Sequence, residues 1–295
     1  MTSDTIVAPV PFSFELYPAR SPERIGEVEQ AATALAASDP QFISVTYGAG
    51  GSTTDRSLGL LRHLRDRTAS EPVAHLTSVG ATHDVLESRI DEFLDAGLRR
   101  FLALRGDPPR GNEASCADDE GVTSVELARL IRSVADRRGV VVDIAAAAYP
   151  NGHPRTGDPR DDISALLAKQ AAGVTLALTQ VVFDADDYAR FLDQARSAGV
   201  EIPIVPGIMP IASPERLDRI CGLTGETAPA DQRAELAAEP DPGRRRAIAV
   251  RRAADIAEGL VAAGAPSLHL YAFNRHETVL DVLRALARRA AGVAV

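Results

Sequence analysis

Two acidic residues stand at or near the ends of short apolar runs, and each run has the composition of a β-strand. Glu15 lies in "PFSFELYP", and Asp107 follows "FLALRG". Two carboxylates can divide acid–base work, because the one that is partly removed from water holds its proton more tightly while the other stays ionised and stabilises a cation. The pair therefore predicts general acid catalysis beside a developing positive charge. The structural alternative is that Asp107 pairs with Arg105 and that Glu15 caps a helix.

Polar and aromatic residues follow the other apolar runs in the same way. Each of them alone could be a helix cap or a loop hydrogen bond, but residues of this kind at the end of every run indicate a common site. They are Thr46, Tyr47, His75, Arg105, Tyr149, His153, Gln180, Gly207, Asn274 and Arg275.

The elements that must position these residues are eight apolar, β-branched runs separated by segments of helical spacing. In the helical segments apolar residues recur three and four positions apart, as at Leu127, Leu130, Ile131 and Val134. Several of these segments end in Ala-Gly, and glycine there suits a helix C-cap before the next strand. The pairs end at Gly97, Gly173, Gly199 and Gly264.

Eight strand–helix repeats predict a single (β/α)₈ TIM barrel, a fold that takes about 250 residues and builds its active site at the C-terminal ends of the strands. A doubly wound sheet is the alternative, but no GxGxxG follows the first run, as a dinucleotide-binding fold requires. Residues 1–11 are expected to form a flexible N-terminal arm, and residues 12–295 one catalytic barrel. Residues 222–246 extend the seventh loop and helix, and whether they close as a mobile lid stays open.

Composition argues against several kinds of partner. The formal net charge of −9 disfavours nucleic acid and anionic membranes. The first residues lack the pattern of a secretory signal, and no apolar run reaches the roughly 18 residues that span a bilayer. Cys116 and Cys221 form neither a CxxC pair nor a disulfide framework, so reduced thiols and a cytoplasmic location are expected.

The sequence gives only weak signals for a metal site or for a catalytic nucleophile. The six histidines show neither HxxxH nor HxH spacing, so no metal site is expected. No GxSxG elbow occurs. The glycine-rich stretch "YGAGGSTTD" lacks the GK[ST] ending of a phosphate-binding loop and indicates only a close approach of the backbone.

Taken in order, the apolar runs and their polar ends resemble the signature segments of the methylenetetrahydrofolate reductase family. The segments are "SFELYPAR", "FISVTYGAGGSTTDRS", "HLTSVGAT", "ALRGDPP", "AAAYPNGHP", "LTQVVFD", "IPIVPGIMPI" and "LYAFNRHE", from about residue 12 to 285. The resemblance implies a (β/α)₈ barrel that reduces 5,10-methylenetetrahydrofolate to 5-methyltetrahydrofolate. It implies small-molecule substrates, with NADH or NADPH as hydride donor, and leaves the oligomeric state open.

The resemblance also implies roles for individual residues. Glu15, which matches the glutamate of "SFE", would protonate a folate nitrogen so that the methylene bridge opens to an iminium cation. Asp107, the aspartate of "RGD", would hold the pterin and stabilise that cation. The expected substrate-binding residues are Gln180, Arg275, Thr46 and Tyr47. The expected cofactor-binding residues are His75, Arg105, Tyr149, His153, Asp162 and Lys169.

The flavin site that most members of the family carry is incomplete here. On the helix before "LTQ" they have an aspartate, an asparagine, an arginine and a lysine, whereas this chain has Asp162, Ala165, Ala168 and Lys169. A family aromatic is also replaced by Thr123. Losing the arginine removes a bidentate contact to the flavin diphosphate.

The sequence therefore favours a resemblance to the flavin-independent, actinobacterial branch of the family, in which the nicotinamide passes hydride directly to the folate and FAD is absent. Two alternatives stay open. One is a flavin-dependent enzyme that works by ping-pong transfer. The other is a catalytically silent folate-binding barrel, and the joint presence of Glu15, Asp107 and Gln180 speaks against it.

Overall fold

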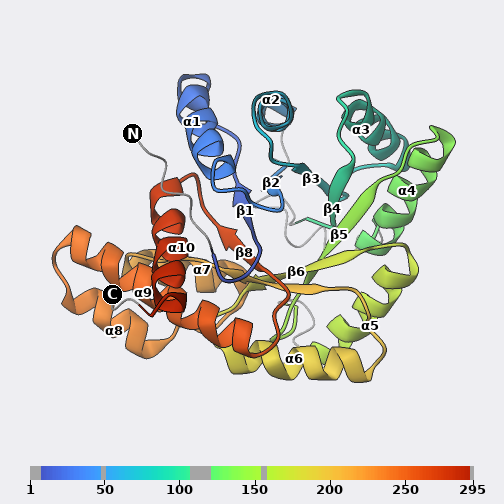
Figure 1. Ribbon diagram of the computed structural model, residues 1–295. Helices are drawn as coiled ribbons and strands as arrows, with labels where there is room; N and C mark the ends of the chain where they lie inside the picture. The colour runs from blue at the N-terminus through green and yellow to red at the C-terminus, as the bar shows by residue number, and fades with distance from the viewer. Residues whose placement is uncertain (1–7, 48–50, 107–120, 154–157, 293–295) are drawn as a thin grey trace.

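The structure, a computed structural model, describes residues 8–47, 51–106, 121–153 and 158–292. Eight parallel strands form a closed barrel in which each strand pairs with the next in chain order and the last pairs with the first (Figure 1). They are β1 (Phe12–Leu16), β2 (Ile43–Val45), β3 (Pro72–Thr77), β4 (Arg100–Leu104), β5 (Asp143–Ala148), β6 (Leu176–Val181), β7 (Ile204–Ile208) and β8 (Leu268–Tyr271). The predicted (β/α)₈ barrel is confirmed.

Helices follow the strands along the chain and surround the barrel (Figure 1). They are the 3₁₀ turn η1 (Pro22–Arg24), α1 (Ile25–Ala36), α2 (Gly51–Arg67), α3 (His83–Asp95), α4 (Ser124–Arg137), α5 (Pro159–Ala171), α6 (Ala185–Ser197), α7 (Pro214–Thr224), α8 (Ala230–Ala238), α9 (Pro242–Ala262) and α10 (His276–Ala290). Residues 222–246 supply the end of α7, the whole of α8 and the start of α9, in agreement with the predicted extension. Among the described residues, no helix combines the length and the apolarity needed to cross a membrane.

Local sequence signals explain where the helices begin and end. Thr123, the residue at the family's aromatic position, is the N-cap of α4 and forms a reciprocal capping box with Glu126. Side chains of Thr82, Asp158, Asp184, Ser213 and Asp241 cap α3, α5, α6, α7 and α9. At the other end, the glycines of the predicted Ala-Gly pairs adopt positive φ, as the C-cap interpretation requires: Gly97, Gly173, Gly199 and Gly264.

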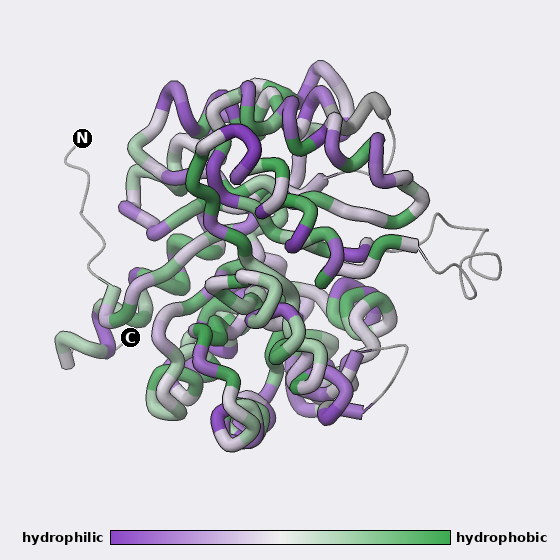
Figure 2. Tube along the Cα trace, turned by 90° about the vertical axis from the view of Figure 1, so that its right-hand side faces the viewer, coloured by the Kyte–Doolittle hydropathy of each residue, from purple (hydrophilic) through white to green (hydrophobic). Residues whose placement is uncertain are grey.

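The buried apolar residues of the described chain form three clusters. The largest lies between the barrel wall and the helices and includes the buried rings of Phe14, Phe93 and Phe101. The second consists of five strand residues and the residue before β2: Phe42, Val73, Leu102, Ala145, Leu178 and Val205. The third joins the end of β6 to α7: Val181, Ile211, Leu217, Ile220 and Cys221. Along the outer helices, apolar and polar segments alternate, as expected for helices that bury one face (Figure 2).

The chain enters the core before the first strand. Of the expected N-terminal arm, residues 1–7 lie outside the described residues. Val10 is buried in the main core, and the carbonyl of Pro11 accepts a hydrogen bond from the Leu268 backbone.

Candidate active site

Glu15, near the C-terminal end of β1, meets two histidines inside the barrel. Its Oε2 lies 3.6 Å from Nε2 of His75 on β3 and 3.9 Å from Nε2 of His269 on β8. The hydroxyl of Thr46 donates a hydrogen bond of 3.3 Å to Oε1. Glu15 is only 8% exposed, so these neighbours replace water around its carboxylate. We refer to Glu15, His75 and His269 as the Glu–His–His cluster.

Ser13 anchors one of the two imidazoles. It lies two residues before Glu15 and therefore on the same face of β1, and its hydroxyl is 2.8 Å from Nδ1 of His269. Within the described residues, Nε2 of His75 and Nε2 of His269 are buried and make no hydrogen bond. A buried polar atom without a hydrogen bond costs free energy, and a catalytic role is one of the reasons for which a protein retains such an atom. Both nitrogens are therefore available to a proton or a ligand beside Glu15.

Burial and charge set the protonation of the cluster. Burial raises the pKa of Glu15, but His269, His75 and the Thr46 hydroxyl lower it by more, so the pKa lies below its usual value. Burial lowers the pKa of His75 by more than the charge of Glu15 raises it. Near neutral pH the carboxylate is therefore ionised and His75 is uncharged, and Glu15 must gain a proton before it can act as an acid.

Tyr271 covers the same end of the barrel. It is the register partner of Glu15 on β8, its ring meets that of His269 edge-on at 5.2 Å, and its hydroxyl donates to the Thr179 carbonyl at 2.7 Å. Gly207 on β7 leaves room for the ring, since a Cβ there would stand 2.4 Å from Tyr271 Cε2. Tyr271 is thus fixed against the barrel wall.

Several sequence-predicted residues lie at this end of the barrel without joining the cluster. Gln180, the last residue but one of β6, is half-buried, and its Oε1 accepts a hydrogen bond from the backbone of Val181. Arg275 is the N-cap residue of α10 and borders a small cavity together with Tyr271. Among the described residues, the partners of Glu15 in hydrogen bonds and ion pairs include neither Gln180 nor Arg275.

Tyr47 is directed elsewhere. It is buried, its ring packs edge-on against Phe93 at 5.9 Å, and the Arg89 guanidinium lies 5.6 Å from the ring centre. The ring therefore faces α3 and not the Glu–His–His cluster. Thr46 and Tyr47 follow the end of β2 and have different partners, Glu15 for Thr46 and Phe93 for Tyr47.

The opening of the "RGD" turn is described, but Asp107 lies outside the described residues. Arg105 follows β4, and Gly106 has a φ of 84°, a conformation that favours glycine. A Cβ at Gly106 would lie 3.0 Å from both Thr77 Cβ and Val79 Cγ1. Glycine is thus required here both by its backbone conformation and by the neighbouring loop after β3.

Four of the six residues expected to bind a cofactor, Tyr149, His153, Asp162 and Lys169, lie after β5 and on α5. The rings of Tyr149 and His153 meet edge-on at 4.5 Å. Asp162 accepts a hydrogen bond of 2.7 Å from the His153 backbone. Lys169 donates one of 2.8 Å to the Ala147 carbonyl of β5, and burial lowers its pKa. Asp162 and Lys169 therefore both already have backbone partners.

This donor set does not fit a flavin diphosphate. Ala165 and Ala168 have methyl groups at the two positions where most members of the resembled family have an amide and a guanidinium. The ammonium of Lys169 is buried and bound to the barrel wall. In the described part of the chain there is also no group of three or more His, Cys, Asp or Glu side chains arranged to hold a metal ion.

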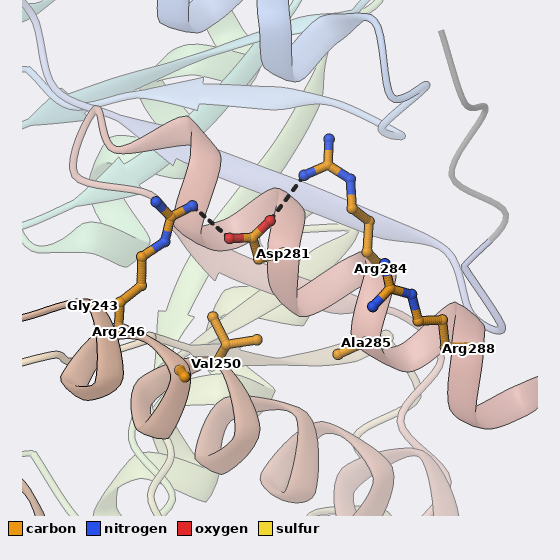
Figure 3. Close-up of a pocket in the computed structure, with 8 residues that line it drawn as sticks. Gly243, Arg246, Val250, Asp281, Arg284, Ala285 and Arg288 are labelled. Carbon is orange, nitrogen blue, oxygen red and sulfur yellow. Dashed lines mark hydrogen bonds and ion pairs between the residues drawn. The ribbon is translucent and has the colours of Figure 1, made fainter. Parts of the chain in front are cut away.

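A second pocket, between α9 and α10, lies on the outside of the barrel (Figure 3). Its cavity of about 300 Å³ is bordered by Arg246 and Arg284, and both pair with Asp281. These ion pairs neutralise part of its charge. None of the residues predicted to be functional borders this pocket, and it is separate from the strand ends.

Comparison with known proteins identifies the family. A sequence model described as "Methylenetetrahydrofolate reductase" matches residues 5–287. The chain belongs to the methylenetetrahydrofolate reductase family. The 5,10-methylenetetrahydrofolate reductase of Escherichia coli is 32% identical over 278 residues, which are 94% of this chain and 90% of that protein. "Methylenetetrahydrofolate reductase (NADH) 1" of Arabidopsis thaliana is 29% identical over 92% of this chain and 47% of its own length.

Solved structures agree on the fold of this family member. A Clostridium thermocellum protein that binds two copies of 5-methyl-5,6,7,8-tetrahydrofolic acid superposes with a TM-score of 0.63 at 14% identity, over 95% of both chains. Dihydropteroate synthase from Xanthomonas albilineans, solved with 7,8-dihydropteroate, gives 0.53 at 14% identity over 97% of this chain and 95% of its own. At such identities the likeness supports the barrel alone.

The family confirms the predicted reaction class, which is methylenetetrahydrofolate reduction by an oxidoreductase. Sequence reasoning had named Glu15, Thr46 and His75, which the structure brings together, but it had missed Ser13 and His269. Ser13 lies two residues before Glu15 on β1, and His269 lies two residues before Tyr271 on β8, so each shares a strand face with a residue near the barrel mouth.

Proposed function

We propose that this protein reduces 5,10-methylenetetrahydrofolate to 5-methyltetrahydrofolate by direct hydride transfer from NADH or NADPH, without a flavin. The observation that carries the proposal is the Glu–His–His cluster, a buried carboxylate with two unpartnered imidazole nitrogens at the C-terminal end of a reductase-family barrel. Family membership supports the folate substrate. The choice of direct transfer rests on the donor set of α5.

The reaction needs one proton and one hydride. Glu15 would give the proton to N10 of the folate, and the bond between N10 and the methylene carbon would break with its electron pair left on N10. The lone pair of N5 then forms the iminium cation, and hydride from C4 of the reduced nicotinamide adds to the methylene carbon. The products are 5-methyltetrahydrofolate and the oxidised nicotinamide, and Glu15 is left ionised.

The cluster suits a group that must load and release a proton. Because the resting Glu15 is ionised, a proton has to reach it as the substrate binds. The two free Nε2 atoms lie within 4 Å of its carboxylate and give that proton alternative positions. Binding of the folate would remove the remaining water and favour the neutral carboxylic acid. Asp107 would then stabilise the iminium cation electrostatically.

Direct transfer is supported by the α5 residues. A flavin diphosphate would need cationic or amide donors from this helix, but Asp162 and Lys169 are engaged with the backbone, and positions 165 and 168 are alanines. Without a resident carrier, nicotinamide and folate must occupy the barrel mouth together.

The experiment is an absorption spectrum of the freshly purified protein from 300 to 550 nm, followed by NADH and NADPH oxidation with methylenetetrahydrofolate and no added flavin. A colourless protein that turns over supports the proposal. Flavin bands, or activity only after FAD is added, would favour ping-pong transfer. A colourless protein that binds folate yet oxidises neither nucleotide, with or without FAD, would favour a silent folate-binding barrel.

A further inference from the structure

A cavity of about 600 Å³ opens where the chain leaves β5 and β6. Asn151 and Phe183, which follow these two strands, line it together with residues of α6, α8 and α9. Because the strands of the barrel are parallel, the cavity reaches the same end of the barrel as Glu15. Its volume lies in the range of about 300–1,000 Å³ that small-molecule sites occupy.

Two observations connect this cavity with the mouth of the barrel. Phe183 packs against the apolar cluster at the end of β6, and Tyr271 of the barrel mouth packs against the same cluster. Asn151 lies between Tyr149 and His153, two of the residues expected to bind the cofactor. The cavity is therefore a place to which a long ligand that reacts at the mouth can extend.

A buried amide lines this cavity without a partner. Gln232, on α8, is only 4% exposed, and its side chain forms no hydrogen bond with the described residues. A buried amide without hydrogen bonds costs free energy, so a ligand that supplies a donor and an acceptor would be bound favourably. Adenine supplies both on one edge, and glutamine pairs with that edge through two hydrogen bonds. Gln232 therefore points to an adenine as the occupant.

Carboxylates outnumber cations around the cavity. The described part of its lining has five carboxylates and one guanidinium. That guanidinium belongs to Arg252, which already pairs with Asp231 and Glu235. An anionic ligand group would thus meet repulsion here, whereas an uncharged group that donates hydrogen bonds would not.

Glu226 is the carboxylate of this lining that most needs a further donor. The amide of Asn151 donates to Glu226 Oε2 at 2.9 Å and to Asp187 Oδ2 at 3.0 Å. Arg190 pairs with Asp187, but Glu226 forms no ion pair with the described residues. Burial raises the pKa of Glu226, the hydrogen bond from Asn151 opposes this, and the charge of Asp187 adds to it. Hydroxyl groups of a ligand would stabilise this half-buried charge.

We propose that this cavity binds the adenosine end of NADH, where Gln232 pairs with the adenine and Glu226 accepts hydrogen bonds from the ribose, and that the cavity selects NADH over NADPH. This inference rests on the proposed function. Adenosine is uncharged and brings an amino group and two hydroxyls as donors, whereas the glutamate end of the folate is anionic. The 2′-phosphate of NADPH would bring a charge of about −1.5 to −2 beside Glu226. An acidic residue at the ribose distinguishes the two nucleotides in the same way in other dehydrogenases.

The test compares the two nucleotides in three variants. Wild type, Gln232→Leu, Glu226→Gln and Glu215→Gln are assayed with NADH and with NADPH at saturating methylenetetrahydrofolate. Glu215→Gln is the matched control, because Glu215 is an exposed acid on α7 outside the cavity lining. Wild type should prefer NADH, and Glu226→Gln should reduce this preference in kcat/KM about tenfold. Gln232→Leu should raise the KM for NADH about tenfold and leave the KM for the folate unchanged.

The melting temperature separates binding from folding. If Gln232→Leu melts below wild type, Gln232→Glu, which keeps the shape of the side chain and loses the amide donor, takes its place with the same expectation. An NADH KM that both variants leave unchanged would overturn the inference, and so would a wild type that prefers NADPH. Free adenosine is the other source of the same chemistry. A variant that no longer binds adenosine but keeps the wild-type KM for NADH would show a separate nucleoside site and overturn the assignment to NADH.

Failure of the proposed function is distinguishable from these outcomes, because wild type would then oxidise neither nucleotide without added flavin. Calorimetric titration of NADH and of NADPH into the protein without folate still decides the point in that event. Tighter binding of NADH, weakened about tenfold in Gln232→Leu, supports the cavity as the adenosine site. Equal binding of both nucleotides, or binding that the variant leaves intact, overturns it.

Discussion

A carboxylate inside a barrel loses the water that would stabilise its charge, so its neighbours decide its protonation. For Glu15 these neighbours are two imidazoles and one hydroxyl, and their combined effect outweighs burial. The arrangement keeps an acid in its ionised form until a ligand changes the surroundings. Glu15 is therefore the residue on which the proposed chemistry depends most.

Replacing Glu15 by glutamine should lower kcat about 10²–10⁴-fold, the usual contribution of a general acid, while folate still binds. The amide keeps the shape of the side chain but has no acidic proton to give. Steady-state kinetics and folate titration measure the two effects. Glu23→Gln, an exposed acid in η1, is the matched control and should keep wild-type rates. Full activity in Glu15→Gln would contradict the assignment of the acid.

His75 should make the fold sensitive to acid. Its pKa is lowered in the folded state, so the unfolded chain binds its proton first as the pH falls below about 6.5. Stability is then lost with falling pH, by at most one proton, or about 1.4 kcal/mol per pH unit. Glu15 acts in the same direction at lower pH, because its folded pKa is also depressed.

Thermal or urea unfolding between pH 7.5 and 5 tests this. His75→Gln should flatten the dependence of the unfolding free energy on pH, whereas His83→Gln, at an exposed position, should retain it. Parallel curves for wild type and His75→Gln would show that this imidazole is protonated as easily in the folded protein as in the unfolded chain.

At the scale of elements, the packing at the strand ends depends both on glycines, which have no side chain, and on residues whose side chains form specific contacts. Gly207 on β7 faces the Tyr271 ring, and Gly106 faces the loop after β3. The turn after β8 instead places Phe273 and Asn274 in the left-handed region, where their side chains form contacts that glycine could not make. The glycines and the turn after β8 thus fix the positions of the side chains around the strand ends.

Gly207→Ala should destabilise the protein by about 1–3 kcal/mol, the usual cost of overpacking, because the new Cβ would meet Tyr271 at 2.4 Å and the Thr179 carbonyl at 2.8 Å. Gly222→Ala is the matched control. Gly222 lies within α7 with nothing within 4 Å of a Cβ, so alanine there should stabilise by about 0.5–1 kcal/mol. Urea unfolding measures both, and similar effects at the two sites would contradict the packing described around Tyr271.

For the whole molecule, the barrel was predictable because the strand patterns, the helix patterns and the helix caps in the sequence all agree with it. Apolar runs, helical spacing and the Ala-Gly caps all repeat with the period of one strand and one helix, and the glycines take the expected positive φ. Residues at strand ends were found because that position marks the mouth of the barrel.

Residues deeper in the barrel were harder to find, since Ser13 and His269 lie within apolar runs and resemble ordinary core positions. The ring of Tyr47 packs against Phe93, whereas the hydroxyl of its neighbour Thr46 donates to Glu15, and a role of Tyr47 in substrate binding stays a prediction. The partners of Ser13 and His269 depend on the register between β1 and β8. These strands lie more than 250 residues apart, and no local pattern specifies their register.

The central claim is direct hydride transfer, and the most direct test follows the hydride itself. NADH deuterated at C4, as each of its two stereoisomers, is supplied with methylenetetrahydrofolate and the protein without added flavin, and the methyl group of the product is analysed by mass spectrometry. We predict one deuterium per methyl group from one isomer only, and none from unlabelled NADH in heavy water. A methyl group that takes its label from heavy water and not from NADH would contradict the account, because the electrons would then pass through a carrier whose hydrogen exchanges with solvent.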